Sequence, residues 1–228
     1  MPLIYLSPSN QTWNRYSFGN TNESDQMRKV AQVVSQELQR YQCDVVVASQ
    51  ALGIEERAAE ANRMGADVYL AIHSNAGGGH GTEAFYAPEK AGSKEFAQSV
   101  YDTVAALTPS PDRGIKNGMA AFNGVGYAEI RVPQRCPCLL EVEFHDREDL
   151  ARWITENIVN LGQAITLGIV NYLHLSPKEP PAPAPDPQSA EFYRVFVQYG
   201  AFTDKANALA SQANIRKLGY NTMILFGG

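Results

Sequence analysis

The sequence has few of the features that mark membrane, nucleic-acid-binding or disulfide-rich proteins. No apolar run approaches the roughly 20 residues that span a bilayer, so we expect no transmembrane segment. A net charge of −5 gives no support for nucleic-acid binding through a basic face. The three cysteines are an odd number and lack metal-finger spacing, so we expect small buried thiols rather than a disulfide framework. The first residues lack the basic segment of a signal peptide, which predicts synthesis in a cytoplasm.

Short apolar runs alternate with segments of helical periodicity. The runs predict strands at residues 3–6, 44–47, 67–73, 82–86 and 138–144. Helices are expected from Asn22 to Leu38, over 53–64 and 96–107, and as one long helix capped by Asp146 and reaching Ile169. The alternation predicts an α/β fold, a largely parallel twisted sheet flanked by helices.

Proline divides the chain. Six prolines fall between residues 176 and 189, a composition typical of an extended, semi-rigid linker. We therefore expect a main domain at residues 1–175, a linker at 176–190 and a small β-α-β module at 191–228.

Polar side chains stand at the ends of the predicted elements. Glu23 opens a helix, His73 ends a strand before a glycine-rich loop, and Glu141 and His145 lie at the end of another strand. In open α/β sheets, ligands bind at the carboxyl edge of the strands. Imidazole and carboxylate ligands with one open position are what a catalytic zinc needs, and a further carboxylate could then serve as general base. The competing interpretation is structural. In it, Glu23 caps a helix, and Glu141 is a buried residue at the end of a strand that pairs with an arginine.

A series of short sequence motifs extends over residues 1–174. The first is Tyr5-Leu6-Ser7-Pro8-Ser9 at the first strand end, followed by Gly19-Asn20-Thr21-Asn22-Glu23, by Arg57 with Ala61-Asn62, and by Ala71-Ile72-His73-Ser74-Asn75-Ala76. Gly81-Thr82-Glu83-Ala84-Phe85-Tyr86, Asp112-Arg113-Gly114-Ile115-Lys116 and Leu139-Leu140-Glu141-Val142-Glu143-Phe144 come next. In this order they resemble the zinc-dependent N-acetylmuramoyl-L-alanine amidases of family 3, found in bacterial autolysins and phage endolysins.

The resemblance implies a site and a reaction. Glu23 and His73 take the positions of two zinc ligands, and Glu141 takes that of the catalytic glutamate. The family hydrolyses the amide between N-acetylmuramic acid and L-alanine in peptidoglycan with a zinc-activated water. Asn75, Arg113 and Arg131 are the expected substrate-binding residues, the arginines through muropeptide carboxylates.

One family feature is absent. The family's first zinc ligand is a histidine just after the first strand, and residues 7–14 contain none. His145 could supply the missing imidazole, with His80 as a poorer substitute. Asn10, Gln11 or Asn14 could act as a weak ligand or hold a ligating water. Alternatively, the metal site is degenerate, and the protein binds peptidoglycan on an amidase fold without cutting it.

The tail resembles part of another family. Residues 193–208 are similar to the first half of a SPOR domain, a family that binds septal peptidoglycan. This implies a wall-binding role or a possible homodimer formed through the module. Together the resemblances predict a phage or prophage endolysin, or a cellular autolysin, whose partner is bacterial peptidoglycan. Without a signal peptide, it is expected to reach the wall after holin release or lysis.

Overall fold

The computed structural model describes residues 1–111, 113–178, 209 and 211–212. The chain divides into two units, Met1–Lys178 and Glu179–Gly228. Apart from residues 209 and 211–212, the predicted β-α-β module, to which a wall-binding role was assigned, lies outside the described residues, as does almost all of the linker. No helix in the described part of the chain combines the length and apolarity needed to cross a membrane.

The first unit is built on a six-stranded sheet with strand order β2-β1-β3-β6-β4-β5. The strands are β1 (Leu3–Pro8), β2 (Asp44–Val47), β3 (Val68–Asn75), β4 (Glu83–Tyr86), β5 (Ile115–Asn117) and β6 (Pro137–Phe144). β1 is parallel to β2 and β3, and β3 is parallel to β6, whereas β4 runs antiparallel to β6. The predicted α/β class and largely parallel sheet are confirmed.

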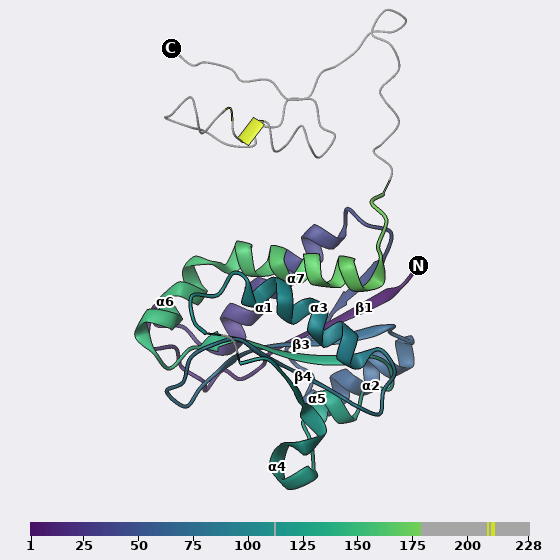
Figure 1. The fold of residues 1–228 in the computed structure, drawn as a ribbon, viewed down its shortest axis with the longest axis horizontal. Coiled ribbons are helices and arrows are strands. Elements are labelled where there is room, and N and C mark those ends of the chain that lie inside the picture. Colours follow the sequence, from purple (N-terminus) through teal and green to yellow (C-terminus); the bar gives the residue numbers. More distant parts are fainter. Residues whose placement is uncertain (112, 179–208, 210, 213–228) are drawn as a thin grey trace, which may run out of the picture. The chain divides into compact units, whose positions relative to one another are not determined.

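Helices cover both faces of this sheet (Figure 1). α1 (Glu23–Leu38), α3 (Ser93–Ala105) and α7 (Ile158–Leu173) lie over one face, and α2 (Ile54–Met64) and α5 (Ala128–Arg131) over the other. The remaining helices are η1 (Gly118–Ala120), α4 (Ala121–Gly124) and α6 (Glu148–Glu156). Alternate strand residues serve the two cores, as Leu70 and Ile72 pack with the first and Tyr69 and Ala71 with the second.

The final helical segment differs from the prediction. It is two helices, α6 and α7, separated at Asn157, where φ is −115° and ψ is 21°. Asp146 does not cap α6, because Arg147 occupies that position. The Asp146 carboxylate instead accepts backbone hydrogen bonds from Gly77 (2.6 Å) and Gly78 (2.7 Å), which fastens the loop after β3.

The short loops at the sheet edge are joined by one side chain, that of Arg57. Arg57 is buried and donates to the carbonyls of Pro8 (2.6 Å), Ser49 (3.1 Å) and Leu52 (3.1 Å). It thus orders the loops after β1 and β2 through their backbone carbonyls. The loop that follows β1 is the one that lies against the site.

Candidate active site

The site lies at the carboxyl edge of the central strands. His73 is near the end of β3 and pairs in register with Glu141 on β6. Glu83, at the start of the antiparallel β4, also pairs with Glu141. Glu23 opens α1, whose cap Asn22 accepts a hydrogen bond from the Asp25 amide as predicted. Parallel strands that end together therefore place acids and an imidazole side by side.

His73 lies between two carboxylates. Its Nδ1 is 2.8 Å from Glu23 Oε1, and its Nε2 is 2.8 Å from Glu129 Oε2. All three side chains are buried. The sequence predicted the approach of Glu23 to His73, and the structure brings them together.

The three charges shift one another's pKa values. Burial would raise the pKa of Glu23 and of Glu129, but hydrogen bonds from His73 and its charge lower both below the usual value. Burial would lower the pKa of His73, but the bonds to Glu129 and Glu23 raise it well above the usual value. Without a cation, the arrangement favours two carboxylates around an imidazolium.

Glu129 is the site residue that the sequence analysis missed. It lies on α5, a helix of four residues after a turn-rich stretch with no clear period. Its Oε1 accepts from Ser7 Oγ (2.6 Å) and Tyr69 OH (2.8 Å). Lys90 Nζ donates to three carbonyls at the end of α5, each 2.6 Å away, and so holds this short helix in place. Arg131, two residues further along α5, was the candidate that the sequence suggested in this segment.

Two amides from the loop after β1 border the Glu23–His73 pair. Gln11 Nε2 lies 3.4 Å from His73 Nδ1. Asn14 Nδ2 donates to Glu23 Oε2 (2.7 Å) and to Gln11 Oε1 (2.9 Å). Asn10 is directed elsewhere, because its amide donates to the Leu52 carbonyl (3.2 Å).

The structure does not bring His145 to Glu23 and His73 as a third metal ligand. Its Nδ1 lies 2.9 Å from both the hydroxyl and the carbonyl oxygen of Ser74. Its ring stacks on Tyr16 with centroids 5.1 Å apart. A shift in the β3–β6 register between His73 and Asn75 precedes this point, so side chains beyond it no longer follow the alternation that starts at Glu141. His80 is exposed in the glycine-rich loop.

Glu141 has a different environment from the other acids. The residue keeps partial exposure, but its Oε2 is sealed from solvent and has no hydrogen-bond partner among the described residues. Burial, with added repulsion from Glu23, Glu83 and Glu129, raises its pKa to about 8 against the attraction of His73. A carboxyl group with a pKa near neutrality can both accept and donate a proton at physiological pH.

The expected substrate-binding residues separate into two places. Asn75 Nδ2 (2.6 Å) and Arg113 Nε (3.0 Å) both donate to Glu83, which also pairs with Lys116. The Arg113 guanidinium lies over the Phe144 ring, 5.2 Å from its centroid. Arg131 instead pairs with the exposed Glu55 on α2 at 3.2 Å. Asn75 and Arg113 thus adjoin the strand carrying Glu141, and Arg131 does not join their cluster.

The donor set accounts for part of a zinc centre. Glu23 offers a carboxylate and His73 offers Nδ1, while a carboxylate on Nε2, here Glu129, is the outer partner that metal-binding histidines usually have. The unpartnered Oε2 of Glu141 is also consistent with a bound ion or water nearby. However, no three His, Cys, Asp or Glu side chains in the described residues are grouped so as to hold a metal. Glu23 and His73 would fit zinc as two donors, and no third donor of these types is grouped with them in the described part of the chain.

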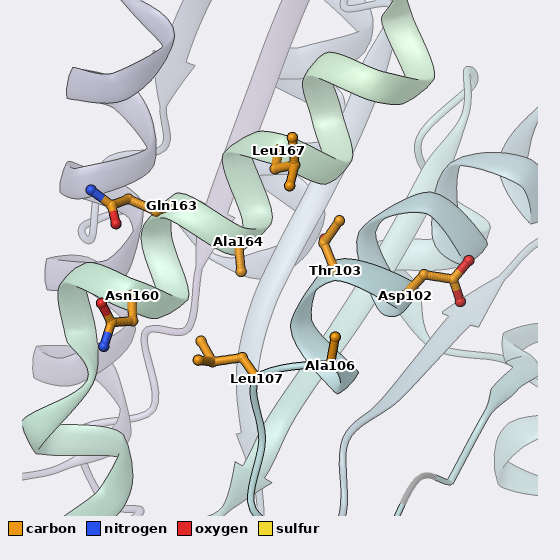
Figure 2. Close-up of a pocket in the computed structure, with 8 residues that line it drawn as sticks. All are labelled: Asp102, Thr103, Ala106, Leu107, Asn160, Gln163, Ala164 and Leu167. Carbon is orange, nitrogen blue, oxygen red and sulfur yellow. The ribbon is translucent and has the colours of Figure 1, made fainter. Parts of the chain in front are cut away.

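A groove between α3 and α7 is separate from this site (Figure 2). Its lining includes Thr103 and Leu107 from the α3 side and Ala164 and Leu167 from α7. None of the site residues lines it, so its shape gives no information about catalysis.

Comparisons with known proteins identify the family of the chain. Residues 8–171 match the model of the N-acetylmuramoyl-L-alanine amidase family. The chain is 28% identical over 178 residues to a sporulation-specific N-acetylmuramoyl-L-alanine amidase of Bacillus subtilis (strain 168), covering 77% of this chain and 63% of that protein. It is 26% identical over 180 residues to the N-acetylmuramoyl-L-alanine amidase CwlM of Bacillus licheniformis, covering 78% and 64%. The chain therefore spans somewhat less than two thirds of these relatives.

Solved structures show the same fold. The catalytic domain of CwlV from Bacillus (Paenibacillus) polymyxa var. colistinus matches with a TM-score of 0.68 and 23% identity, over 77% of this chain and 100% of that one. An N-acetylmuramoyl-L-alanine amidase from Clostridium difficile 630 matches with a TM-score of 0.67 and 24% identity, over 76% and 97%. With the family match over most of the first unit, these findings show that the chain belongs to the N-acetylmuramoyl-L-alanine amidase family.

Proposed function

We propose that the protein hydrolyses the amide bond between N-acetylmuramic acid and L-alanine in bacterial peptidoglycan, as a zinc-dependent amidase. The observation that carries the proposal is Glu141, in register with His73, whose Oε2 is sealed from solvent and whose carboxyl group has a pKa of about 8. The family match supports the reaction, and Glu23 and His73 supply two donors for the metal. A bound zinc would supply Lewis acidity toward the scissile carbonyl.

Glu141 is the proposed proton carrier. In the first step it takes a proton from the attacking water, and in the second it delivers that proton to the nitrogen of the leaving alanine. Its environment suits both steps, because burial keeps the group protonated to about pH 8 while a cation nearby favours the carboxylate. Glu129 would assist indirectly, since its carboxylate accepts a hydrogen bond from Nε2–H of His73, and the proton held on Nε2 leaves Nδ1 free to bind a metal.

The substrate is proposed to lie along the same sheet edge. Arg113 is half-exposed. Its Nε donates to the Glu83 carboxylate and the plane of its guanidinium lies over the Phe144 ring, so the guanidinium is oriented before a ligand binds. A stem-peptide carboxylate is the group that such a guanidinium recognises. Asn75 is held in the same cluster. Arg131 remains a proposed substrate contact, at a different place near α2.

Digestion of purified cell walls tests the activity. The protein is incubated with walls and zinc, and newly exposed amino termini are labelled and identified. We expect N-terminal alanine from the wild type and none from Glu141→Gln. A new terminus other than alanine would indicate a zinc carboxypeptidase or endopeptidase cutting within the stem peptide and would overturn the assignment.

A second candidate function is binding of peptidoglycan without cleavage. It is favoured by one observation, the hydrogen-bonded amides that fill the place beside Glu23 and His73 where a third strong ligand would stand. In that case the protein pellets with insoluble walls but releases no amino termini. The same digestion therefore separates the two functions.

The biological setting is a further proposal. We propose an endolysin or autolysin that is made in the bacterial cytoplasm and reaches the wall after holin release or lysis, with residues 191–228 as a SPOR-like wall-binding or dimerising module. Cell fractionation before and after lysis, with detection of the chain by antibody, tests the location. Sedimentation of the full chain with and without residues 191–228 tests the module.

A further inference from the structure

The loop after β1 carries three aromatic side chains, and one of them faces solvent. Tyr16 is buried and stacks on His145, and the Arg152 guanidinium lies 4.0 Å from the ring centroid of Phe18. Trp13, in contrast, is 69% exposed, and its ring takes part in none of the aromatic or cation–π contacts among the described residues. An indole combines a large apolar face with a polar edge, which is why tryptophan is enriched where proteins bind partners.

The backbone on both sides of Trp13 is fixed to the active site. Before it, the Ser9 amide donates to the Ile72 carbonyl of β3 (2.9 Å). After it, the Glu23 amide donates to the Asn14 carbonyl (2.9 Å), and the Asn14 side chain donates to Glu23 Oε2 (2.7 Å). A side chain on a backbone held in this way is oriented in advance, so that a ligand loses little affinity to the ordering of the loop.

The strand order indicates which part of the substrate lies near Trp13. Along the sheet edge the loop after β1 is followed by His73 on β3, Glu141 on β6 and Glu83 on β4. Adjacent strands lie about 4.8 Å apart, which separates β1 from β4 by about 14 Å. Arg113, the proposed contact for a stem-peptide carboxylate, pairs with Glu83 at the β4 end. Because the scissile amide joins peptide to sugar, a peptide that extends toward β4 directs the sugar toward β1 and Trp13.

The size of the apolar surface favours a single ring as the ligand. Thr12 and Arg15, the exposed neighbours of Trp13 in the loop, are polar. A stable protein interface buries about 800 Å² on each partner, far more than one indole offers. A pyranose ring carries C–H groups on one face, and this face matches a flat aromatic side chain in size.

We propose that Trp13 binds a pyranose ring of the glycan strand by stacking, as a specificity-determining residue on the sugar side of the site. The inference rests on the proposed amidase function and adds the contact that distinguishes a glycan-linked stem peptide from a free peptide. Trp13 touches the sugar and not the scissile amide. It therefore affects binding of the substrate and not the proton transfers at Glu141.

Tryptophan fluorescence tests the contact directly. The chain has two tryptophans, Trp13 and Trp153, and residues 191–228 contain none, so glycan bound by that segment gives no tryptophan signal of its own. Wild type, Trp13→Phe and Phe122→Ala are titrated with soluble glycan strands from which the stem peptides have been removed. We expect the emission of the wild type to shift to shorter wavelength as water leaves the indole, and that of Trp13→Phe to stay unchanged.

Phe122→Ala is the matched control. Phe122 is also an exposed aromatic side chain, at 66%, but its ring lies on Tyr127, which packs against Phe85 of β4. It therefore belongs to the peptide side of the site. Phe122→Ala should show the same shift in emission as the wild type.

Kinetics on a soluble glycan–peptide fragment give a second readout. Trp13→Ala should raise KM about tenfold, the size of a stacking contact between two rings. The value of kcat should stay unchanged, because the sugar is bound equally in the ground state and the transition state. Trp13→Phe retains a ring and should recover most of the loss, and Phe122→Ala should keep the wild-type KM.

Three outcomes overturn the proposal: no shift in the wild type, an equal shift in Trp13→Phe, or a wild-type KM in Trp13→Ala. A shift that appears with rising protein concentration and without glycan would place a second copy of the chain on Trp13, and would overturn it as well. Failure of the proposed function has a different signature. If the wild type cleaves no fragment but glycan strands still shift the Trp13 emission, the amidase activity is refuted and the sugar contact stands.

Discussion

Glu141→Gln is expected to make the protein more stable at neutral pH and inactive at the same time. The substitution keeps the shape of the side chain and removes its titration. In the metal-free protein the Glu141 pKa is raised from 4.5 to about 8, chiefly by burial. Between these values the folded protein holds a proton that the unfolded chain has released. Stability from this group is therefore complete below about pH 4.5 and is lost as the pH rises toward 8.

The magnitude follows from the width of that window. Each pH unit changes the free energy of unfolding by about 1.4 kcal/mol while the two states differ by one proton. At pH 7 the ionisation of Glu141 has therefore lowered the free energy of unfolding of the wild type by up to about 3 kcal/mol relative to acid pH. This is an upper limit, because the residue keeps partial exposure. Glu141→Gln removes this dependence on pH. As a general acid–base residue, Glu141 should contribute about 10²–10⁴-fold to the rate, so the variant should lose cleavage.

Urea unfolding at pH 5, 6, 7 and 8 in the presence of a chelator measures the effect through the two tryptophans, Trp13 and Trp153. The stability gap between Glu141→Gln and the wild type should widen in favour of the variant as the pH rises. Glu148→Gln, at the exposed start of α6, serves as the matched control and should follow the wild type. Parallel pH profiles for Glu141→Gln and the wild type would refute the argument about burial, and retained wall cleavage would refute the role in catalysis.

Three further substitutions test other parts of the account. Glu129→Gln offers an amide donor to Nε2 of His73, which shifts the imidazole proton to Nδ1. Zinc affinity, measured by competition with a chelator, should therefore fall about 10–100-fold. Unchanged affinity would contradict the role of Glu129. Arg113→Ala should raise KM for a muropeptide about fivefold, as for a half-exposed charged contact, with kcat unchanged. Gly168→Ala should lower the free energy of unfolding by about 1–3 kcal/mol, because its Cβ would lie 2.6 Å from Val100 Cα, whereas alanine at the exposed neighbour Leu167 should have little effect.

The sequence was sufficient to predict five of the six strands and the approximate places of three site residues, whereas β5 (Ile115–Asn117) was not predicted. Strand and helix periods reflect which face of an element is buried, and parallel strands end at a shared edge. Glu23, His73 and Glu141 were therefore expected to meet. His73 and Glu23 lie 2.8 Å apart, and His73 pairs in register with Glu141. Periodicity also identified α1, whose cap and buried stripe the structure confirms.

Contacts that depend on short elements and on register shifts could not be predicted in this way. Glu129 reaches His73 from a four-residue helix whose place is set by Lys90 and by packing, not by any period in its own sequence. His145 lies four residues after Glu141, which suggested the same direction, but the shift in register near Asn75 and the hydrogen bonds to Ser74 turn its ring elsewhere. Asp146 was expected to cap the final helix because it precedes it, but its carboxylate accepts hydrogen bonds from the backbone amides of Gly77 and Gly78 instead.

The most direct test of the central claim is mass spectrometry of a defined muropeptide, N-acetylmuramic acid linked to a stem peptide, after incubation with the metal-stripped protein and with the zinc-loaded protein. We expect only the zinc-loaded wild type to split it, into free N-acetylmuramic acid and a peptide that begins with alanine, and we expect Glu141→Gln to leave it whole. An intact muropeptide under all conditions, or cleavage between two amino acids of the stem, would contradict the account.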